Sequence, residues 1–235
     1  FASEVKAFLA MPGFKPAINN QALHHYLTFA NVPAPETLFE GVSKLEAGTY
    51  LTINRQGRMR QQRYWNPASF KPGGFLLTEQ DCVGELRRLL RQSVRRRMVS
   101  DVPFGVFLSG GVDSSLNVAL MAELLDRPVE TFSIGIKDDS SNEFVHARQV
   151  ADHFRTNHHE AVIDDDDFIA FLPRMAYLQD EPVADPVCVP LYYLSKLARE
   201  SGTPVIQVGE GSDEIFAGYQ TYHLFEIWNR RYYEP

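Results

Sequence analysis

The sequence has little cysteine and no long apolar run. Among its 235 residues the cysteines are Cys82 and Cys188, too far apart for a pair of zinc ligands and too few for a disulfide framework. No stretch of about 18 apolar residues could span a bilayer, and no charged and then apolar leader opens the chain. We therefore expect a soluble protein of the reducing cytoplasm, with no membrane partner.

The charge does not suit a protein that coats nucleic acid. The formal net charge is -7, and the basic residues concentrate between Arg87 and Arg97. We interpret that run as the solvated faces of a helix rather than as a binding patch. We expect no nucleic-acid partner, whereas small polar or anionic substrates stay open.

Two patterns divide the chain. Residues 1–66 are short apolar pieces broken by proline and glycine, with a hairpin expected from 49–53 and 59–65, and they predict the β-rich end of a larger domain. Residues 67–77, with two prolines and two glycines, predict a linker, and 78–235 predict a second, incomplete domain. Because the chain starts at Phe1 and ends within a helical pattern, we expect a fragment at both ends.

From residue 78 onward, helical patterns alternate with apolar strands. A helix is expected from its N-cap Thr78 to about Val99, with Val83, Leu86, Leu90, Val94 and Met98 on one face. Strands are expected at 104–108, 129–136, 160–163 and 204–208, and helices at 114–125, 142–154, 165–178 and 191–200. This order predicts an α/β fold in which helices cover both faces of a parallel sheet.

One loop carries the residue types of a phosphate site. Ser109-Gly110-Gly111-Val112-Asp113-Ser114-Ser115 follows a predicted strand and opens a predicted helix. Paired glycines let backbone N–H groups approach phosphate oxygens, the serine hydroxyls add donors, and the helix N-terminus adds partial positive charge. Because an open α/β sheet binds ligands beyond the carboxyl ends of its strands, we expect phosphate here.

Asp113 indicates that a cation accompanies the phosphate at this loop. A carboxylate repels phosphate unless a cation lies between them, so Asp113 is a candidate Mg²⁺ ligand. In G-x-x-x-x-G-K-[ST] loops a lysine follows the glycine, and here no lysine follows Gly110 and Gly111. We therefore expect the loop to hold a departing pyrophosphate.

Ser-Gly-Gly-x-Asp-Ser resembles the pyrophosphate loop of the ATP pyrophosphatase superfamily, and residues 102–108 are similar to asparagine synthetases in particular. Residues 209–219, which follow the last predicted strand, resemble the second signature of that family. Further matches are residues 131–136 and 180–186, and residues 1–6, 37–42 and 48–50 are similar to the end of a class II glutaminase domain. The resemblance covers nearly the whole chain.

The resemblance implies a glutamine-hydrolysing, asparagine synthetase-type ligase that uses ATP and Mg²⁺. A carboxylate, expected to be the side chain of aspartate, attacks the α-phosphate of ATP to give an acyl adenylate and pyrophosphate. Ammonia from glutamine then displaces AMP and leaves an amide. Class II glutaminases use an N-terminal cysteine, which neither Cys82 nor Cys188 can be, so we expect no glutaminase activity from this chain alone. A homodimer is a further expectation.

The resemblance also implies roles for single residues. Asp113 and Asp213 are the expected Mg²⁺ ligands, and Glu210 is the expected base for the attacking ammonia. The expected nucleotide-binding residues are Leu108, Ser109, Gly110, Gly111, Asp113, Ser114, Ser115, Ile134, Gly135, Gly209 and Glu210. Val208 and Ala217 depart from the serine and glycine that are usual in the family, which bears on the substrate more than on the chemistry.

Several alternatives stay open. Glu181 and Asp185 fit loop caps and substrate binding about equally, and His158 and His159 are expected to be structural. The rival enzymes are a β-lactam synthetase, an amidotransferase acting on another acid and, less favoured, a tRNA-thiolating relative. A non-catalytic nucleotide-binding scaffold is the rival from another class.

Overall fold

The computed structural model describes residues 1–69, 78–138 and 143–232, so most of the predicted linker lies outside the described residues. The chain forms two compact units. The first unit comprises Phe1–Leu77 and Asp166–Val189, and the second comprises Thr78–Asp165 and Pro190–Pro235. Residues 166–189, which the sequence pattern groups with the second domain, therefore pack with the first 77 residues. The domain boundaries at 66 and 77 stay a prediction.

The first unit contains helices as well as the expected hairpin. Strands β1 (Thr49–Ile53) and β2 (Met59–Arg63) pair antiparallel, as predicted. Helices α1 (Lys6–Leu9) and α2 (Asn20–Phe29) were not predicted. The signal for α2 was Asn19, whose side chain accepts hydrogen bonds from two backbone N–H groups of the first turn. The 3-10 turn η1 (Pro67–Ser69) and most of α6 (Asp165–Gln179) complete this unit.

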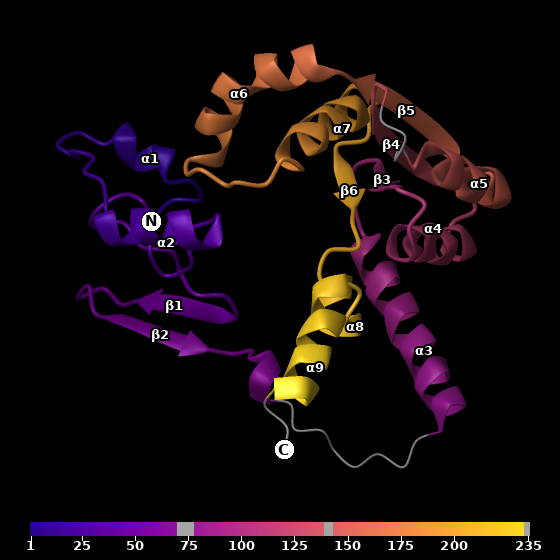
Figure 1. The fold of residues 1–235 in the computed structure, drawn as a ribbon, viewed down its shortest axis with the longest axis horizontal. Helices are drawn as coiled ribbons and strands as arrows, with labels where there is room; N and C mark the ends of the chain where they lie inside the picture. Colours follow the sequence, from indigo (N-terminus) through magenta and orange to yellow (C-terminus); the bar gives the residue numbers. More distant parts are fainter. Residues whose placement is uncertain (70–77, 139–142, 233–235) are drawn as a thin grey trace. The chain divides into compact units, whose positions relative to one another are not determined.

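The second unit is built on a parallel sheet. Its strands are β3 (Phe104–Phe107), β4 (Glu130–Ile136), β5 (Asn157–Ile163) and β6 (Val205–Gln207), in the order β5-β4-β3-β6 (Figure 1). All three strand pairs are parallel. The helices are α3 (Glu79–Arg97), α4 (Val112–Leu124), α5 (Phe144–Phe154), α7 (Cys188–Glu200), α8 (Ser212–Phe216) and α9 (Gln220–Tyr232). The predicted α/β class is confirmed.

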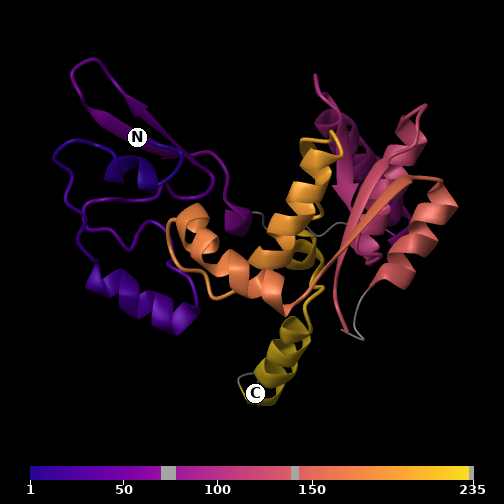
Figure 2. The ribbon, with the colours of Figure 1, turned by 90° about the horizontal axis from the view of Figure 1, so that it is seen from above.

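Helices cover both faces of this sheet (Figure 2). On one face, Val106 of β3 packs in a cluster with Met121 of α4 and Ala147 of α5. On the other face, Phe132 of β4 packs with Leu194 and Ala198, which lie in the part of α7 that belongs to this unit. Alternate residues of a strand point to opposite faces, so a short apolar strand supplies both clusters.

Strand β5 begins three residues earlier than expected, at Asn157 rather than Glu160. No apolar pattern indicates these three residues, because they are polar. Asn157 Nδ2 donates to Glu130 Oε2 at 2.8 Å, and His158 Nδ1 lies 2.9 Å from Thr131 Oγ1. Partners on the neighbouring strand β4 therefore satisfy these side chains within the sheet.

Helix α3 begins at the expected N-cap. Thr78 and Asp81 exchange side-chain-to-backbone hydrogen bonds at 3.2 and 3.1 Å, which is a capping box. Only the second half of the predicted stripe packs, because Val94 is buried whereas Val83 is 59% exposed. The periodicity thus predicted the helix correctly but overestimated its packed length.

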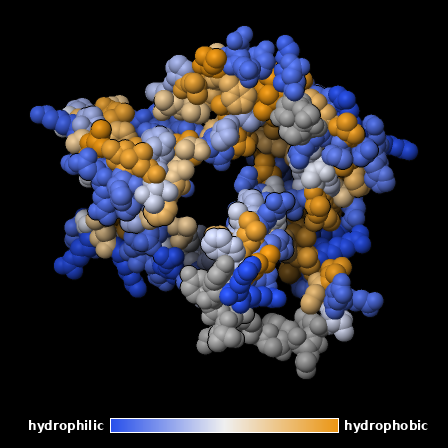
Figure 3. All heavy atoms as spheres, in the orientation of Figure 1, coloured by the Kyte–Doolittle hydropathy of each residue, from blue (hydrophilic) through white to orange (hydrophobic). Residues whose placement is uncertain are grey.

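No helix in the described ranges has both the length and the apolar character needed to cross a membrane. Some helices nevertheless carry large apolar side chains that are exposed to solvent. Examples are Ile169 on α6 and Phe225 and Trp228 on α9, and apolar surface is visible over α6 in Figure 3.

We predict that Met121→Ala destabilises the second unit by about 2–5 kcal/mol, because Met121 is fully buried in the cluster between α4 and the sheet. Val145→Ala is the matched control: Val145 is 62% exposed on α5, so its loss should change the free energy of unfolding by about 0.5 kcal/mol or less. Urea denaturation followed by circular dichroism measures both changes. Equal effects would contradict the assignment of this core.

Candidate active site

The loop after β3 starts from a fixed backbone. Leu108 is 2% exposed, and its N–H donates to Phe132 O of β4 at 2.8 Å. The carbonyl of Leu108 accepts a hydrogen bond from Ser133 Oγ. These contacts hold the first residue of the loop against β4, so the following glycines begin from a defined position. Sequence reasoning missed the contribution of Ser133.

Serine side chains close the loop on itself. Ser109 Oγ and Ser114 Oγ lie 3.0 Å apart, Gly111 N–H donates to Ser109 Oγ at 3.2 Å, and Ser114 Oγ donates to Gly111 O at 3.2 Å. The hydroxyl of Ser115 is buried and finds no hydrogen-bond partner among the described residues. A buried hydroxyl without a partner is unfavourable, so Ser115 Oγ is an unsatisfied polar atom at the base of this loop.

Gly110 is required by its surroundings. Its φ is +88°, and a Cβ there would lie 2.6 Å from Ala147 N and from the carbonyl carbon of His146. Only glycine combines a left-handed backbone with so close an approach. The loop therefore packs directly on the first turns of α5, a contact that the sequence pattern did not indicate.

The second signature reaches the same edge of the sheet. Because β3 and β6 are parallel neighbours, their following loops leave the sheet at the same edge. A Cβ on Gly209 would lie 3.0 Å from Cβ of Asp113 and 3.8 Å from Nδ2 of Asn117. The loop after β6 thus lies on the first turns of α4. Asn117, four residues after Asp113 on the same helix, was not among the predicted site residues.

Asp213 and Glu210 differ in their surroundings. Asp213 lies in the first turn of α8, and its Oδ1 is so close to Gly218 that a Cβ at that position has no space. The Gly218 N–H also donates to Asp213 O at 3.0 Å. Ala217, where glycine is more usual, takes a left-handed φ of 56°. Glu210 is exposed. The loop is therefore closed around Asp213 and leaves the Glu210 side chain in solvent.

Strand β4 extends beyond its neighbour on this side. Its pairing with β3 runs to Phe132, whereas its pairing with β5 continues to Ile136. Ile134 and Gly135, the residues expected to receive adenine, lie in this overhang, and Gly135 is buried. The backbone edge that faces away from β5 is therefore not used by β3 at these two positions.

The carboxylates set a limit on any metal site. Within the part of the chain that the structure describes, no three histidine, cysteine, aspartate or glutamate side chains lie together so that they could hold a metal ion. The roles of Asp113 and Asp213 as Mg²⁺ ligands therefore stay a prediction.

The residues whose roles were left open have structural contacts. Glu181 Oε1 accepts from Leu38 N–H at 2.5 Å in the first unit, and Asp185 Oδ1 accepts from Val187 N–H at 3.0 Å within its own loop. These contacts favour loop stabilisation over substrate binding.

His158 and His159 are part of the sheet. Burial lowers the pKa of His158, and this effect outweighs the attraction of Glu160. His159 Nε2 lies 3.0 Å from Glu130 Oε2. The imidazole ring of His159 stacks on the ring of Phe132, with 4.9 Å between the two ring centroids. Both histidines have partners within the sheet, as a structural role requires.

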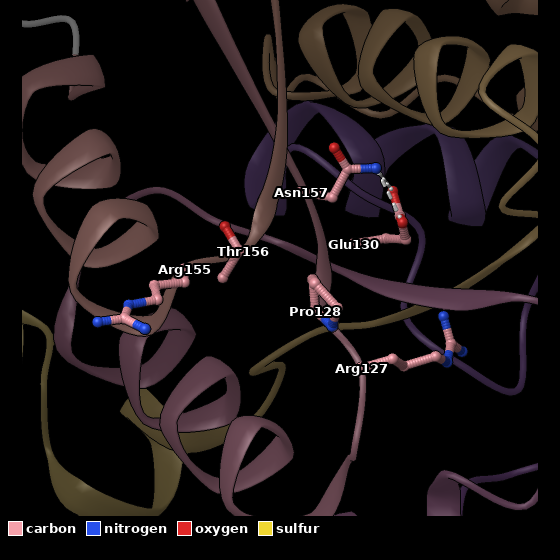
Figure 4. A pocket seen from close by; sticks show the side chains of 6 residues that line it. All are labelled: Arg127, Pro128, Glu130, Arg155, Thr156 and Asn157. Atoms are coloured by element: carbon pink, nitrogen blue, oxygen red, sulfur yellow. Dashed lines mark hydrogen bonds between the residues drawn. The ribbon is translucent and has the colours of Figure 1, made fainter.

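A cavity of about 350 Å³ opens elsewhere in the second unit (Figure 4). Its lining residues are Arg127, Pro128, Glu130, Arg155, Thr156 and Asn157. They lie at the amino ends of β4 and β5, the edge opposite the two loops. Figure 4 shows Arg127 and Arg155 on opposite sides of the cavity. Because ligands of open parallel sheets bind beyond the carboxyl ends, we place the candidate active site at the loops.

Solved structures with a similar arrangement include the U34-tRNA thiolase NcsA from Methanococcus maripaludis, with a TM-score of 0.43 and 13% identity over 63% of this chain and 52% of that chain. Another is an NH3-dependent NAD synthetase from Campylobacter jejuni, with a TM-score of 0.37 and 14% identity over 61% of each chain. Both likenesses are too distant to carry an argument about function.

Curated relatives are much closer in sequence. The chain is 37% identical over 223 residues to asparagine synthetase [glutamine-hydrolyzing] 1 of Bacillus subtilis, a match that covers 94% of this chain and 34% of the relative. It is 30% identical over 243 residues to asparagine synthetase [glutamine-hydrolyzing] 3 of the same organism, covering 97% of this chain and 39% of the relative. The chain therefore spans well under half the length of these relatives.

Family models divide the chain in two. The glutamine amidotransferase domain model matches residues 1–65, and the asparagine synthase model matches residues 85–234. The second match includes both loops at the carboxyl edge of the sheet and covers more than half of the chain. The chain belongs to the asparagine synthase family.

Proposed function

We propose that the protein is an ATP-dependent ligase that forms an amide from a carboxylic acid. The acid, which we take to be aspartate through its side chain, attacks the α-phosphate of ATP and releases pyrophosphate. Ammonia derived from glutamine then attacks the acyl adenylate, and AMP leaves. The first step is needed because a free carboxylate is a poor acyl donor.

One observation carries this proposal: the two signature loops meet at one edge of the sheet. Gly209 lies against Asp113, so a ligand held by the Ser109–Ser115 loop is also within reach of the loop after β6. A phosphate-binding turn alone would be common to many α/β proteins. Its contact with a second carboxylate-bearing loop is what a triphosphate activated at its inner phosphorus requires.

The residues of the first loop would hold the leaving pyrophosphate. The backbone N–H of Gly110 and the N–H groups at the start of α4 would donate to its oxygens. Asp113 and Asp213 would hold Mg²⁺, which offsets negative charge on the departing group. The backbone of Ile134, on the edge that β3 does not use, and the adjoining Gly135 would receive the adenine.

Glu210 would act on the second substrate. It directly follows Gly209, and its side chain is exposed at the edge where the loops meet. A carboxylate there can take a proton from the attacking ammonia. The contacts of Asp185 and Glu181 leave neither of them as a better candidate for this role.

We expect the protein at its full natural length to exchange labelled pyrophosphate into ATP only when aspartate is present. Exchange reports the reversible adenylation step and needs neither glutamine nor ammonia. The same assay with glutamate and β-alanine derivatives serves as control. Exchange supported by another acid but not by aspartate would favour the rival ligases, and no exchange with any acid would favour a nucleotide-binding scaffold.

We predict that Asp113→Asn lowers aspartate-dependent exchange by about 100-fold, because charge on the leaving pyrophosphate is no longer offset. Asp126→Asn, an exposed aspartate after α4, is the matched control and should keep the wild-type rate. Circular dichroism of both variants should be unchanged. A wild-type rate in Asp113→Asn would exclude a role for this carboxylate in adenylation.

A further inference from the structure

Within the first unit, the segment that follows α6 is held against residues 5–44 by two carboxylates with little exposure. Glu181 is 9% exposed, and its Oε1 accepts from Leu38 N–H at 2.5 Å. Its Oε2 lies 2.6 Å from Lys44 Nζ, which also donates to Val32 O at 3.0 Å. Both oxygens of this carboxylate are therefore used by residues that come about 140 positions earlier in the chain.

The preceding residue makes a second fastening. Asp180 takes a left-handed φ of 63° at the end of α6, and its side chain is 9% exposed. Its Oδ2 accepts from Val5 N–H at 2.6 Å, and its Oδ1 pairs with Lys6 Nζ at 2.7 Å. Burial opposes ionisation, but the hydrogen bonds from Lys6 and Val5 outweigh it and hold the pKa of Asp180 below its usual value. Asp180 is thus ionised near neutral pH.

A backbone bond extends the contact. Ala184 N–H donates to Ala30 O, at the end of α2, at 2.9 Å. We call residues 180–184 the clasp. Ionised carboxylates are costly to bury unless each is paired and hydrogen-bonded, so a clasp fastened through Asp180 and Glu181 is specific for the residues it meets. An apolar contact of the same size would not demand these partners.

The clasp crosses the boundary between the two family models. It lies inside the asparagine synthase match at 85–234, whereas all its partners lie inside the glutamine amidotransferase match at 1–65. Yet both sides of the contact fall in one compact unit. Along the chain, the clasp is reached from β5 through α6, and it leads through α7 to β6, the strand whose loop contains Gly209 (Figure 1).

We propose that Asp180 and Glu181 are positioning residues that couple ammonia supply by the glutaminase part to amide formation at the loop after β6. This inference rests on the proposed function. The clasp is held by residues 5–44. It therefore restrains α6, which connects it to β5, and α7, which connects it to β6. When the clasp is released, glutamine hydrolysis and adenylation continue separately, and ammonia is lost to solvent.

The test uses the full-length protein and the variants Glu181→Ala and Glu181→Gln. Two rates and one ratio are compared with those of wild type. The rates are aspartate-dependent pyrophosphate exchange and amide formation from ammonium salt, and the ratio is glutamate released per amide formed from glutamine. We expect Glu181→Ala to raise the glutamate-to-amide ratio about threefold or more, while the two rates stay within about twofold. Glu181→Gln keeps an acceptor for Leu38 N–H but loses the ion pair with Lys44. Its glutamate-to-amide ratio should therefore lie between those of wild type and Glu181→Ala.

Two controls separate coupling from plain stability. Glu46→Ala removes the exposed ion pair with Arg63 in the same unit and should leave the ratio unchanged. Lys44→Arg keeps the charge that faces Glu181 and should keep the wild-type ratio, whereas Lys44→Met should raise it. Hydrogen exchange of the Leu38 amide should quicken in Glu181→Ala and stay slow in Glu46→Ala, which shows the clasp directly and without turnover.

The outcomes are distinct. An unchanged ratio in Glu181→Ala together with faster exchange of the Leu38 amide would overturn the proposal. A fall of pyrophosphate exchange and of ammonium-dependent amide formation by more than about tenfold would also overturn it. Slow exchange at Leu38 in Glu181→Ala would show that the clasp contact itself is wrong. Absence of aspartate-dependent pyrophosphate exchange in the wild type would instead contradict the proposed function.

Discussion

The close packing of Gly209 against Asp113 is the constraint on which the candidate site depends. It brings the loop after β6 onto the first turn of α4, with only 3.0 Å between the Asp113 Cβ and the place of a Cβ on Gly209. Such packing is available only because β3 and β6 are parallel neighbours, so that both chains leave the sheet in the same direction. A side chain at position 209 would separate the loops, and the donors of one loop and the carboxylate of the other would no longer face one ligand.

The clasp places a second constraint at a distance from the chemistry. A segment of the synthetase match is held by the amidotransferase match through Asp180 and Glu181, whose oxygens are all engaged. Sequence families and compact units therefore divide this chain differently. Under the proposed function, ammonia made in one part is used in the other, and shared structure between the two parts would help to keep the two reactions in step.

Much of the second unit could be predicted from the sequence, because local patterns determine it. The apolar strand, glycine turn and amphipathic helix around Gly110 are contiguous, and their order predicts a loop at the carboxyl edge. The pairing of β3 with β6 could not be predicted, because about 100 residues separate the two strands. The spacing of apolar residues does not indicate which strands pair. The polar start of β5 was missed because His158 is satisfied by Thr131 across the sheet rather than by an apolar neighbour. The contacts of Glu181 were unpredictable for the same reason: a single buried carboxylate carries no sequence signal for its distant partners.

We propose that the loops after β3 and β6 bind one nucleotide together. Hydrogen–deuterium exchange with and without MgATP reports each loop separately. We expect MgATP to slow exchange in residues 109–115 and in residues 208–214, with no change at residues 127–130 and 155–157, which line the cavity at the opposite edge. Slower exchange at that cavity, or at one loop without the other, would contradict it.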